Sequence, residues 1–286
     1  MWAAARILVR LLFLAGALAL LLGALDLDVL GRELAQASSL WLGAALLLFN
    51  GSQALSAVRL QVLLRPLQAL PPIGEQLRLY YAGMFCNLYL PGGIGGDGLK
   101  AYWLGRRFSV GLGALIRALV LDRAAGLAAL GALALGLAAL WNGAWAWAAA
   151  GAGALLLYPA LANGLFPRFR GTALPALGIS LGVQVLQGAS AWALMQALGL
   201  EGTLYLLLFY LSAIAALAPV TIGGLGAREL VFLYGLTWTG HPPGGGVALG
   251  LLFFAVTGIS ALAGWPLVGR FLRVEHRADP APHRGP

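Results

Sequence analysis

The sequence predicts an all-α, polytopic membrane protein with about six full spans, two opposed re-entrant helical hairpins and an inverted repeat. Of its 286 residues, 60% are hydrophobic and only 10% are charged, which leaves too little polar surface to cover a water-soluble protein of this size. A helix needs about 20 apolar residues to cross a bilayer core of roughly 30 Å. Apolar runs that are expected to form the spans lie at residues 7–25, 41–58, 112–140, 144–161, 174–198 and 247–268.

Two shorter apolar stretches, residues 76–90 and 203–218, each continue into a glycine-rich loop. The loops, PGGIGGDGLK at 91–100 and PVTIGGLGAR at 219–228, share the pattern P-x-x-I-G-G-x-G-x-[KR]. Because the flanking charges put both ends of each segment on one side of the membrane, we predict re-entrant hairpins that enter from opposite faces. A second interpretation stays open, in which the glycines only permit a tight hairpin and close helix packing.

The distribution of charge predicts the orientation of the spans, because lysine and arginine accumulate in cytoplasmic loops. The net charge of +8 is therefore explained by orientation, and no nucleic-acid partner is expected. The acidic loop at 26–33 and Glu201 are expected outside. The residues expected inside, together with both termini, are Arg6, Arg10, Arg59, Arg65, Arg78, Arg106, Arg107, Arg168, Arg170, Arg270, Arg273 and Arg277.

This topology divides the chain into one transmembrane domain over residues 1–273 with inverted halves of about 1–142 and 143–273. Interrupted helices at matching positions of two such halves are typical of secondary transporters. The polar, proline-rich segment 274–286 is expected to be a disordered cytoplasmic tail. The single Cys86 and the three histidines share no ligand spacing, so neither a metal site nor a cofactor is expected.

The two loops predict an anion site within the bilayer. Glycine leaves backbone N–H groups uncovered, and a helix that starts after the loop presents the positive end of its dipole. Irregular backbone at this depth needs a water-filled cavity or a protein partner. Lys100 and Arg228 lie one turn into the following helices and would complete the site. The loop positions that we single out are Pro91, Gly95, Gly96, Gly98, Pro219, Gly223, Gly224 and Gly226.

Charges within the spans are the second functional signal, because ionisable side chains at that depth are costly and usually face a cavity. Arg123 is expected to bind a headgroup or to pair with Asp97 or Glu229. Asp122 is expected to orient an arginine or to relay a proton. Asp97 and Lys100 share a helical face and can pair.

Polar side chains also occur at matching places in the second and sixth predicted spans. They either line one cavity or form hydrogen bonds between the two helices. These residues are Asn50, Ser52, Gln53, Gln184 and Gln187.

Three strings carry a family resemblance: YYAGMFCNLYLPGGIGGDGLKAYWLGRR, LDRAAGL at 121–127 and APVTIGGLGARE. Together they resemble the transmembrane region of the lysylphosphatidylglycerol synthase family, whose members are flippase-like, over roughly residues 5–272. The family motif falls here on Asn87, Pro91, Gly95, Gly96, Asp97, Lys100, Asp122, Arg123, Pro219, Gly223, Gly224, Gly226, Arg228 and Glu229. The best-known relatives carry a soluble domain that aminoacylates phosphatidylglycerol. Only the short tail follows the last span here, so we do not carry that activity over.

The resemblance implies a stand-alone lipid translocase of a prokaryotic cytoplasmic membrane and not an enzyme. Its cargo would be an anionic or aminoacylated phospholipid or a polyprenyl-phosphate lipid, held in a midplane polar cavity that the rocking of one half against the other exposes alternately. Asn87, Lys100, Arg123 and Arg228 would bind this lipid. The charge partners or proton carriers would be Asp97, Asp122 and Glu229.

Two alternatives stay open. One is an intramembrane enzyme that modifies a lipid or polyprenyl-phosphate headgroup, and the other is a non-transporting partner of a separate lipid synthase. A homo-oligomer is compatible with each of these functions.

Overall fold

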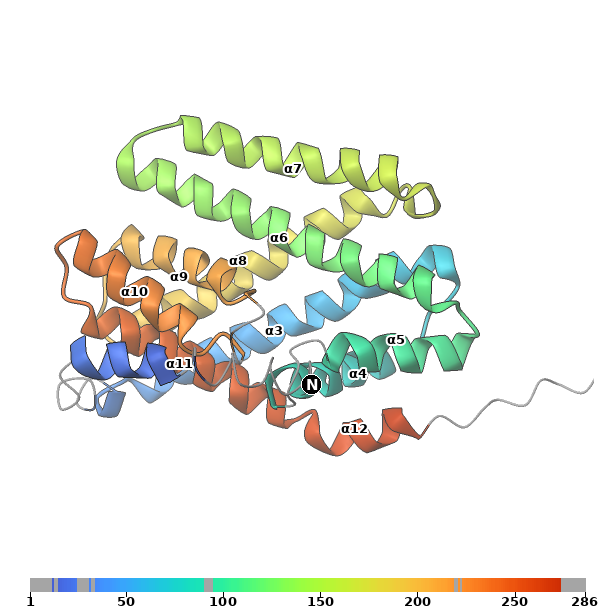
Figure 1. Ribbon diagram of the computed structural model, residues 1–286, viewed down its shortest axis with the longest axis horizontal. Coiled ribbons are helices and arrows are strands. Elements are labelled where there is room, and N and C mark those ends of the chain that lie inside the picture. Colours follow the sequence, from blue (N-terminus) through green and yellow to red (C-terminus); the bar gives the residue numbers. More distant parts are fainter. Residues whose placement is uncertain are drawn as a thin grey trace, which may run out of the picture.

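The computed structural model describes residues 12, 15–24, 31, 34–89, 95–218, 221 and 223–273. Helices joined by turns make up this part of the chain, and it contains no β-strand, which confirms the predicted all-α class. The elements in chain order (Figure 1) are α3 (Ser39–Leu64), η1 (Arg65–Leu67), α4 (Ile73–Tyr89), α5 (Gly95–Phe108), α6 (Leu112–Asn142), α7 (Ala146–Leu165), η2 (Pro167–Phe169), α8 (Ala173–Ala197), α9 (Thr203–Ala215), α10 (Ala227–Trp238), α11 (Gly244–Leu262) and α12 (Trp265–Leu272).

Five of the described helices, α3, α6, α7, α8 and α11, are long and apolar enough to cross a membrane. They correspond to five of the six predicted spans, and the polytopic character is thereby confirmed. The first predicted span, 7–25, lies partly outside the described residues, which show a shorter apolar helix over Ala15–Ala24. The tail 274–286 also lies outside them.

The last predicted span, 247–268, is wrong as one continuous helix. Helix α11 ends at Leu262, and α12 begins at Trp265. Pro266 occupies the first turn of α12, where its missing N–H is tolerated, whereas it would interrupt a continuing helix. Gly264 touches the backbone carbonyl of Tyr81 so closely that a side chain would clash. The break therefore lets α12 lie against α4 and α5.

Two helical hairpins enter the molecule from opposite ends. Helices α4 and α5 pack together, as do α9 and α10. Figure 1 shows the first pair in one half of the molecule and the second pair in the other. The described parts of the hairpins touch, because Gly223 before α10 lies against Leu88 near the end of α4. This geometry agrees with the predicted hairpins, and their depth in a bilayer stays a prediction.

The turns on either side of the first hairpin share an unusual backbone conformation. Among the described residues, Gln68 and Ser109 are the non-glycine positions with positive φ, at 55° and 53°. Such residues are uncommon and carry strain. One precedes α4 and the other follows α5, so the hairpin is connected to its neighbouring spans by strained turns.

The packing of the first half recurs in the second. Helix α3 contacts α4 and α6, and α8 correspondingly contacts α9 and α11. The halves are joined by contacts of α6 with α9, of α4 with α11 and, most extensively among the described helices, of α3 with α8. Helices α3 and α8, which occupy corresponding places in the two predicted halves, run in opposite directions (Figure 1), and the inverted repeat itself stays a prediction.

Arginines gather at one end of the described structure, where α3, α5, α7 and α12 end (Figure 1). Arg168 donates to the Pro66 carbonyl at 3.5 Å, and Arg270 lies 3.8 Å from Glu75. We call this the basic end. The turns at the opposite end, 143–145, 198–202 and 239–243, contain Glu201 and His241 but no lysine or arginine.

Candidate functional site

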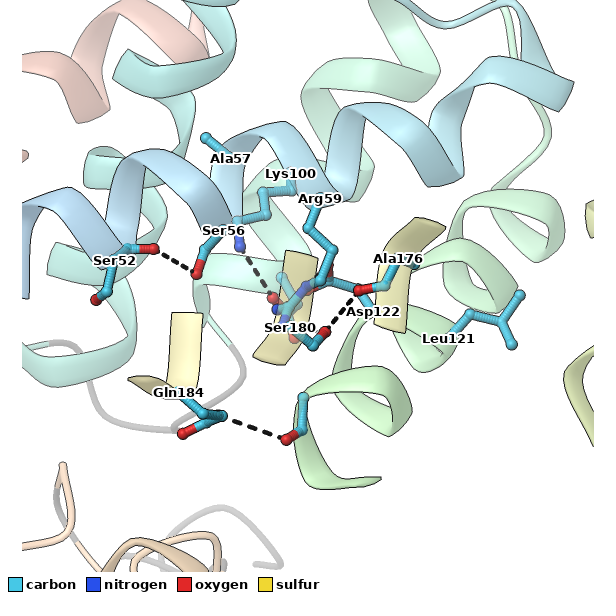
Figure 2. Close-up of polar contacts among 12 residues, drawn as sticks. Ser52, Ser56, Ala57, Arg59, Lys100, Leu121, Asp122, Ala176, Ser180 and Gln184 are labelled. Carbon is cyan, nitrogen blue, oxygen red and sulfur yellow. Dashed lines mark hydrogen bonds and ion pairs between the residues drawn. The ribbon is translucent and has the colours of Figure 1, made fainter. Parts of the chain in front are cut away.

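Polar side chains form hydrogen bonds between α3 and α8, and we call Ser52, Arg59, Ser180 and Gln187 the polar seam. Gln187 Nε2 donates to Ser52 Oγ at 3.5 Å, and Arg59 Nη1 donates to Ser180 Oγ at 3.0 Å. Figure 2 shows Arg59 of α3 directed toward Ser180 of α8 and Asp122 of α6. Hydrogen bonding between helices, one of the two open interpretations of these polar residues, is what the structure shows for Asn50, Ser52, Gln184 and Gln187. Gln53 donates to Ser52 within α3.

Arg59 of the polar seam also forms an ion pair with Asp122 on α6. Arg59 Nε lies 2.7 Å from Asp122 Oδ1, and Nη2 lies 2.9 Å from Oδ2, which is a bidentate arrangement. The two side chains are only 7% and 8% exposed. Gly126 leaves room for the guanidinium, since a Cβ there would lie 3.1 Å from Nη1. Asp122 thus orients an arginine, as one of its two predicted roles requires.

The prediction that Arg59 lies in an inside loop with Arg65 is wrong. Arg59 is a buried residue of α3, and only Arg65, in η1, lies at the helix end. The apolar sequence resumes after Arg59 at 60–64, so the helix continues past the charge. A cation with apolar residues on both sides was the signal that sequence reasoning missed.

A second ionic cluster consists of Asp97 and Lys100 on α5 and Arg123 on α6. Arg123 Nε and Nη2 each lie 2.6 Å from Asp97 Oδ2, and Lys100 Nζ lies 3.5 Å from Oδ1. We call these three residues the Asp97 cluster. The ammonium of Lys100 is buried and lies 4.0 Å from the centre of the Tyr80 ring, in cation–π geometry. Of the two partners predicted for Arg123, the structure shows Asp97.

Exposure differs sharply within the Asp97 cluster. The Lys100 and Asp97 side chains are 6% and 14% exposed, whereas that of Arg123 is 53% exposed. Asp122 and Arg123 are neighbours in sequence, so the buried ion pair and the Asp97 cluster share one turn of α6. The Arg123 side chain thus pairs with the Asp97 carboxylate, while about half of its surface stays exposed.

Asn87 and Gly96 fix the first hairpin near its tip. The Asn87 Oδ1 accepts a hydrogen bond of 2.9 Å from the Gly96 backbone N–H, which is one of the unpaired donors at the start of α5. A Cβ at Gly96 would clash with the Gly83 carbonyl and approach Asn87 Cγ to 2.8 Å. Close helix packing, the second interpretation of these glycines, therefore applies to Gly96.

The Gly96→Ala variant should lose about 1–3 kcal/mol of stability, because the added methyl forces α4 and α5 apart. Gly98→Ala is the matched control, since nothing lies within 4 Å of the position of its Cβ. Thermal unfolding of the detergent-solubilised protein measures both. Equal stability of the two variants would contradict the close packing at Gly96.

The two glycine loops align in sequence but differ in structure. Gly95 and Gly96 begin α5, whereas Gly223, Gly224 and Gly226 precede α10 with φ of 63°, 88° and 84°. These positive values require glycine. Arg228 is consequently the second residue of α10, whereas Lys100 lies in the second turn of α5. Pro91 and Pro219 lie outside the described residues.

Arg228 and Glu229 form a buried polar site against α11. Glu229 Oε2 accepts a hydrogen bond of 2.7 Å from the Gly226 N–H, which caps α10. Glu229 Oε1 and Arg228 Nη1 are buried without a hydrogen-bond partner. The guanidinium lies 5.1 Å from the centre of the Phe253 ring. Within the described residues Arg228 makes no hydrogen bond or ion pair with the Asp97 cluster, so its share in one common site stays a prediction.

The fold and these contacts define a polytopic α-helical membrane protein with a buried ion pair between two of its spans and two opposed hairpins. The sequence model of the family described as Lysylphosphatidylglycerol synthase TM region matches residues 7–174, and the chain belongs to this family. No curated protein matches the chain.

The family match is shorter than the expected resemblance over residues 5–272. It includes the Asp97 cluster, Asn87 and Asp122, and ends within α8. The second hairpin follows this range. What the resemblance implies for Pro219, Gly223, Gly224, Gly226, Arg228 and Glu229 therefore stays a prediction.

Proposed function

We propose that the protein is a translocase for lipids with phosphate-bearing headgroups and that it is not an enzyme. The observation that supports this most is Arg123, a half-exposed guanidinium eleven residues into α6, an apolar helix of 31 residues. An arginine near the bilayer centre costs at least about 2.5–3.5 kcal/mol unless a polar group or water receives it. A phosphate oxygen fits the forked donors of a guanidinium.

The Asp97 carboxylate occupies the place at Arg123 that a lipid phosphate would take. It pairs with both Arg123 and Lys100 when no lipid is present, and the cluster of two cations and one carboxylate keeps one net positive charge. An incoming phosphate would replace the Asp97 carboxylate at Arg123, while Asp97 stays beside Lys100. The acyl chains would remain in the bilayer. Asp97, Asp122 and Glu229 are also the proposed proton carriers if transport is coupled to protons.

The proposed location is a prokaryotic cytoplasmic membrane, with the basic end and both termini in the cytoplasm. The segregation of arginine to one end of the described structure supports this orientation. The proposed cargo is an anionic or aminoacylated phospholipid or a polyprenyl-phosphate lipid. Membership of the family supports a role with membrane lipids.

The Arg123→Gln variant tests the proposal. Loss of a hydrogen bond to a charged group, about 1.5–3 kcal/mol, should slow headgroup movement about tenfold or more. The measurement is the transfer of fluorescent phosphatidylglycerol between the leaflets of reconstituted vesicles. Arg117→Gln is the matched control, because Arg117 is an exposed arginine of the same helix, and it should transport normally.

An unchanged rate in Arg123→Gln would contradict the assignment of Arg123. Recovery of a chemically altered headgroup, detected by mass spectrometry, would favour the enzyme instead. Neither movement nor chemical change in the wild-type protein, tested across the three proposed lipid classes, would favour a non-transporting partner.

A further inference from the structure

An apolar groove lies between α5 and α12, on the far side of α5 from the Asp97 cluster. Its volume is about 210 Å³, and its lining includes Gly95, Gly98, Leu99 and Tyr102 of α5 with Val268 and Leu272 of α12. Positions 95, 98, 99 and 102 share one face of a helix, whereas Asp97 and Lys100 lie on the opposite face. The groove is thus separate from the proposed transport site.

The walls of the groove are fixed by contacts behind it. Phe271 of α12 is fully buried, and its ring packs edge-on against Trp103 of α5 with centroids 5.2 Å apart. The open space results from glycine, since nothing lies within 4 Å of a Cβ at Gly98. In a membrane-spanning protein, an exposed apolar groove of this kind borders the lipid tails.

Arginines lie where the groove approaches the basic end of the molecule. Helices α5 and α12 run side by side in the same direction (Figure 1), and both end with exposed arginines. The Arg106 guanidinium lies 5.6 Å from the centre of the Tyr102 ring, which lines the groove. Arg273 directly follows Leu272, which is the last residue of α12 and another lining residue. No carboxylate pairs with Arg106 or Arg273 in the described part of the chain.

We propose that this groove holds one resident anionic phospholipid from the leaflet at the basic end. One acyl chain fills the space beside Gly98, and the phosphate binds between Arg106 and Arg273. Charge complementarity selects the occupant, because a neutral or zwitterionic lipid leaves the positive charge of the two arginines uncompensated. The bound lipid bridges α5 and α12 and is distinct from the transported lipid.

Native mass spectrometry of the full-length protein, purified in detergent with added phosphatidylglycerol or phosphatidylcholine, tests the proposal. The wild-type protein should retain phosphatidylglycerol at least tenfold better than phosphatidylcholine. Gly98→Leu fills the groove and should reduce retention of phosphatidylglycerol at least tenfold. Gly113→Leu is the matched control, because Gly113 is an exposed helical glycine with nothing within 4 Å of its Cβ position and lies outside the groove, and it should retain phosphatidylglycerol normally.

A second variant keeps the test decisive if Gly98→Leu does not fold. The double variant Arg106→Gln, Arg273→Gln leaves the groove open and should bind both lipids equally. Retention of phosphatidylglycerol by Gly98→Leu at the wild-type level, or an unchanged lipid preference in the arginine double variant, would overturn the proposal. Because Arg106 and Arg273 lie outside the Asp97 cluster and the glycine loops, loss of the lipid preference with normal headgroup movement in the arginine double variant separates this site from the transport site.

Discussion

Asp122→Asn should lower the free energy of unfolding by about 3–5 kcal/mol, the largest effect on stability that we expect from a single substitution. It leaves the Arg59 guanidinium buried beside a neutral amide, and an uncompensated buried charge is far more costly than a missing surface pair. The Arg59 side chain is only 7% exposed, and its guanidinium lies in the space that Gly126 leaves on α6, so little water can compensate the charge. This loss of stability can be measured without a transport assay.

The double variant Arg59→Met, Asp122→Leu is the decisive comparison. Replacing both charges with apolar side chains should recover most of the stability, because an intact buried pair contributes little net free energy. Unfolding in detergent, followed by tryptophan fluorescence, measures all variants. Glu201→Gln, in an exposed turn, is the control and should change stability by less than about 0.5 kcal/mol. Equal losses in the single and double variants would contradict a charge-based explanation.

Asp97→Asn should bind an anionic headgroup about tenfold more tightly and move it more slowly. In the wild-type protein a phosphate has to displace the Asp97 carboxylate from Arg123, which contacts it at 2.6 Å. Without that competitor, about 1.5 kcal/mol or more of charge-assisted hydrogen bonding is gained on binding. Slower movement follows, because the carboxylate no longer helps to release the lipid.

Calorimetry with a short-chain, water-soluble phosphatidylglycerol measures this affinity in detergent. Glu75→Gln is the control, since Glu75 is a carboxylate that pairs with another arginine, Arg270, at the basic end. Affinity in Asp97→Asn that is unchanged or weaker than in the wild-type protein would refute the competition between Asp97 and phosphate. Together with Arg123→Gln, which should bind more weakly, the two variants give opposite shifts around one contact.

The length and continuity of apolar sequence were enough to predict most of the fold. Five spans were predicted nearly at their observed places, because crossing a bilayer requires a minimum helix length. The two helical hairpins were also predicted from short apolar stretches that end in glycine-rich loops, and their re-entry into the membrane stays a prediction. The break after α11 was missed, although Gly264 and Pro266 gave a local signal for it.

The candidate site was most predictable where its contacts are local, although Asp97, 26 residues from Arg123, was one of the two partners predicted for it. Asp97 and Lys100 are three residues apart, and their pairing follows from helical spacing. The partner of Asp122 was not predictable in this way, because Arg59 lies 63 residues earlier and on another helix. The alignment of the glycine loops also concealed a difference in backbone: α5 begins at Gly95, whereas Gly223, Gly224 and Gly226 precede α10.

The polar seam between α3 and α8 limits how such a protein can alternate between its two sides. Arg59 belongs to the first half of the chain, yet it bonds Asp122 in that half and Ser180 in the other. Separating the two halves would break the hydrogen bond from Arg59 to Ser180 at this buried site, whereas the Arg59–Asp122 ion pair lies within the first half and would stay intact. Movement of the hairpins against a fixed pair of helices α3 and α8 breaks neither contact. The strained turns at Gln68 and Ser109 are the positions about which the α4–α5 hairpin would pivot.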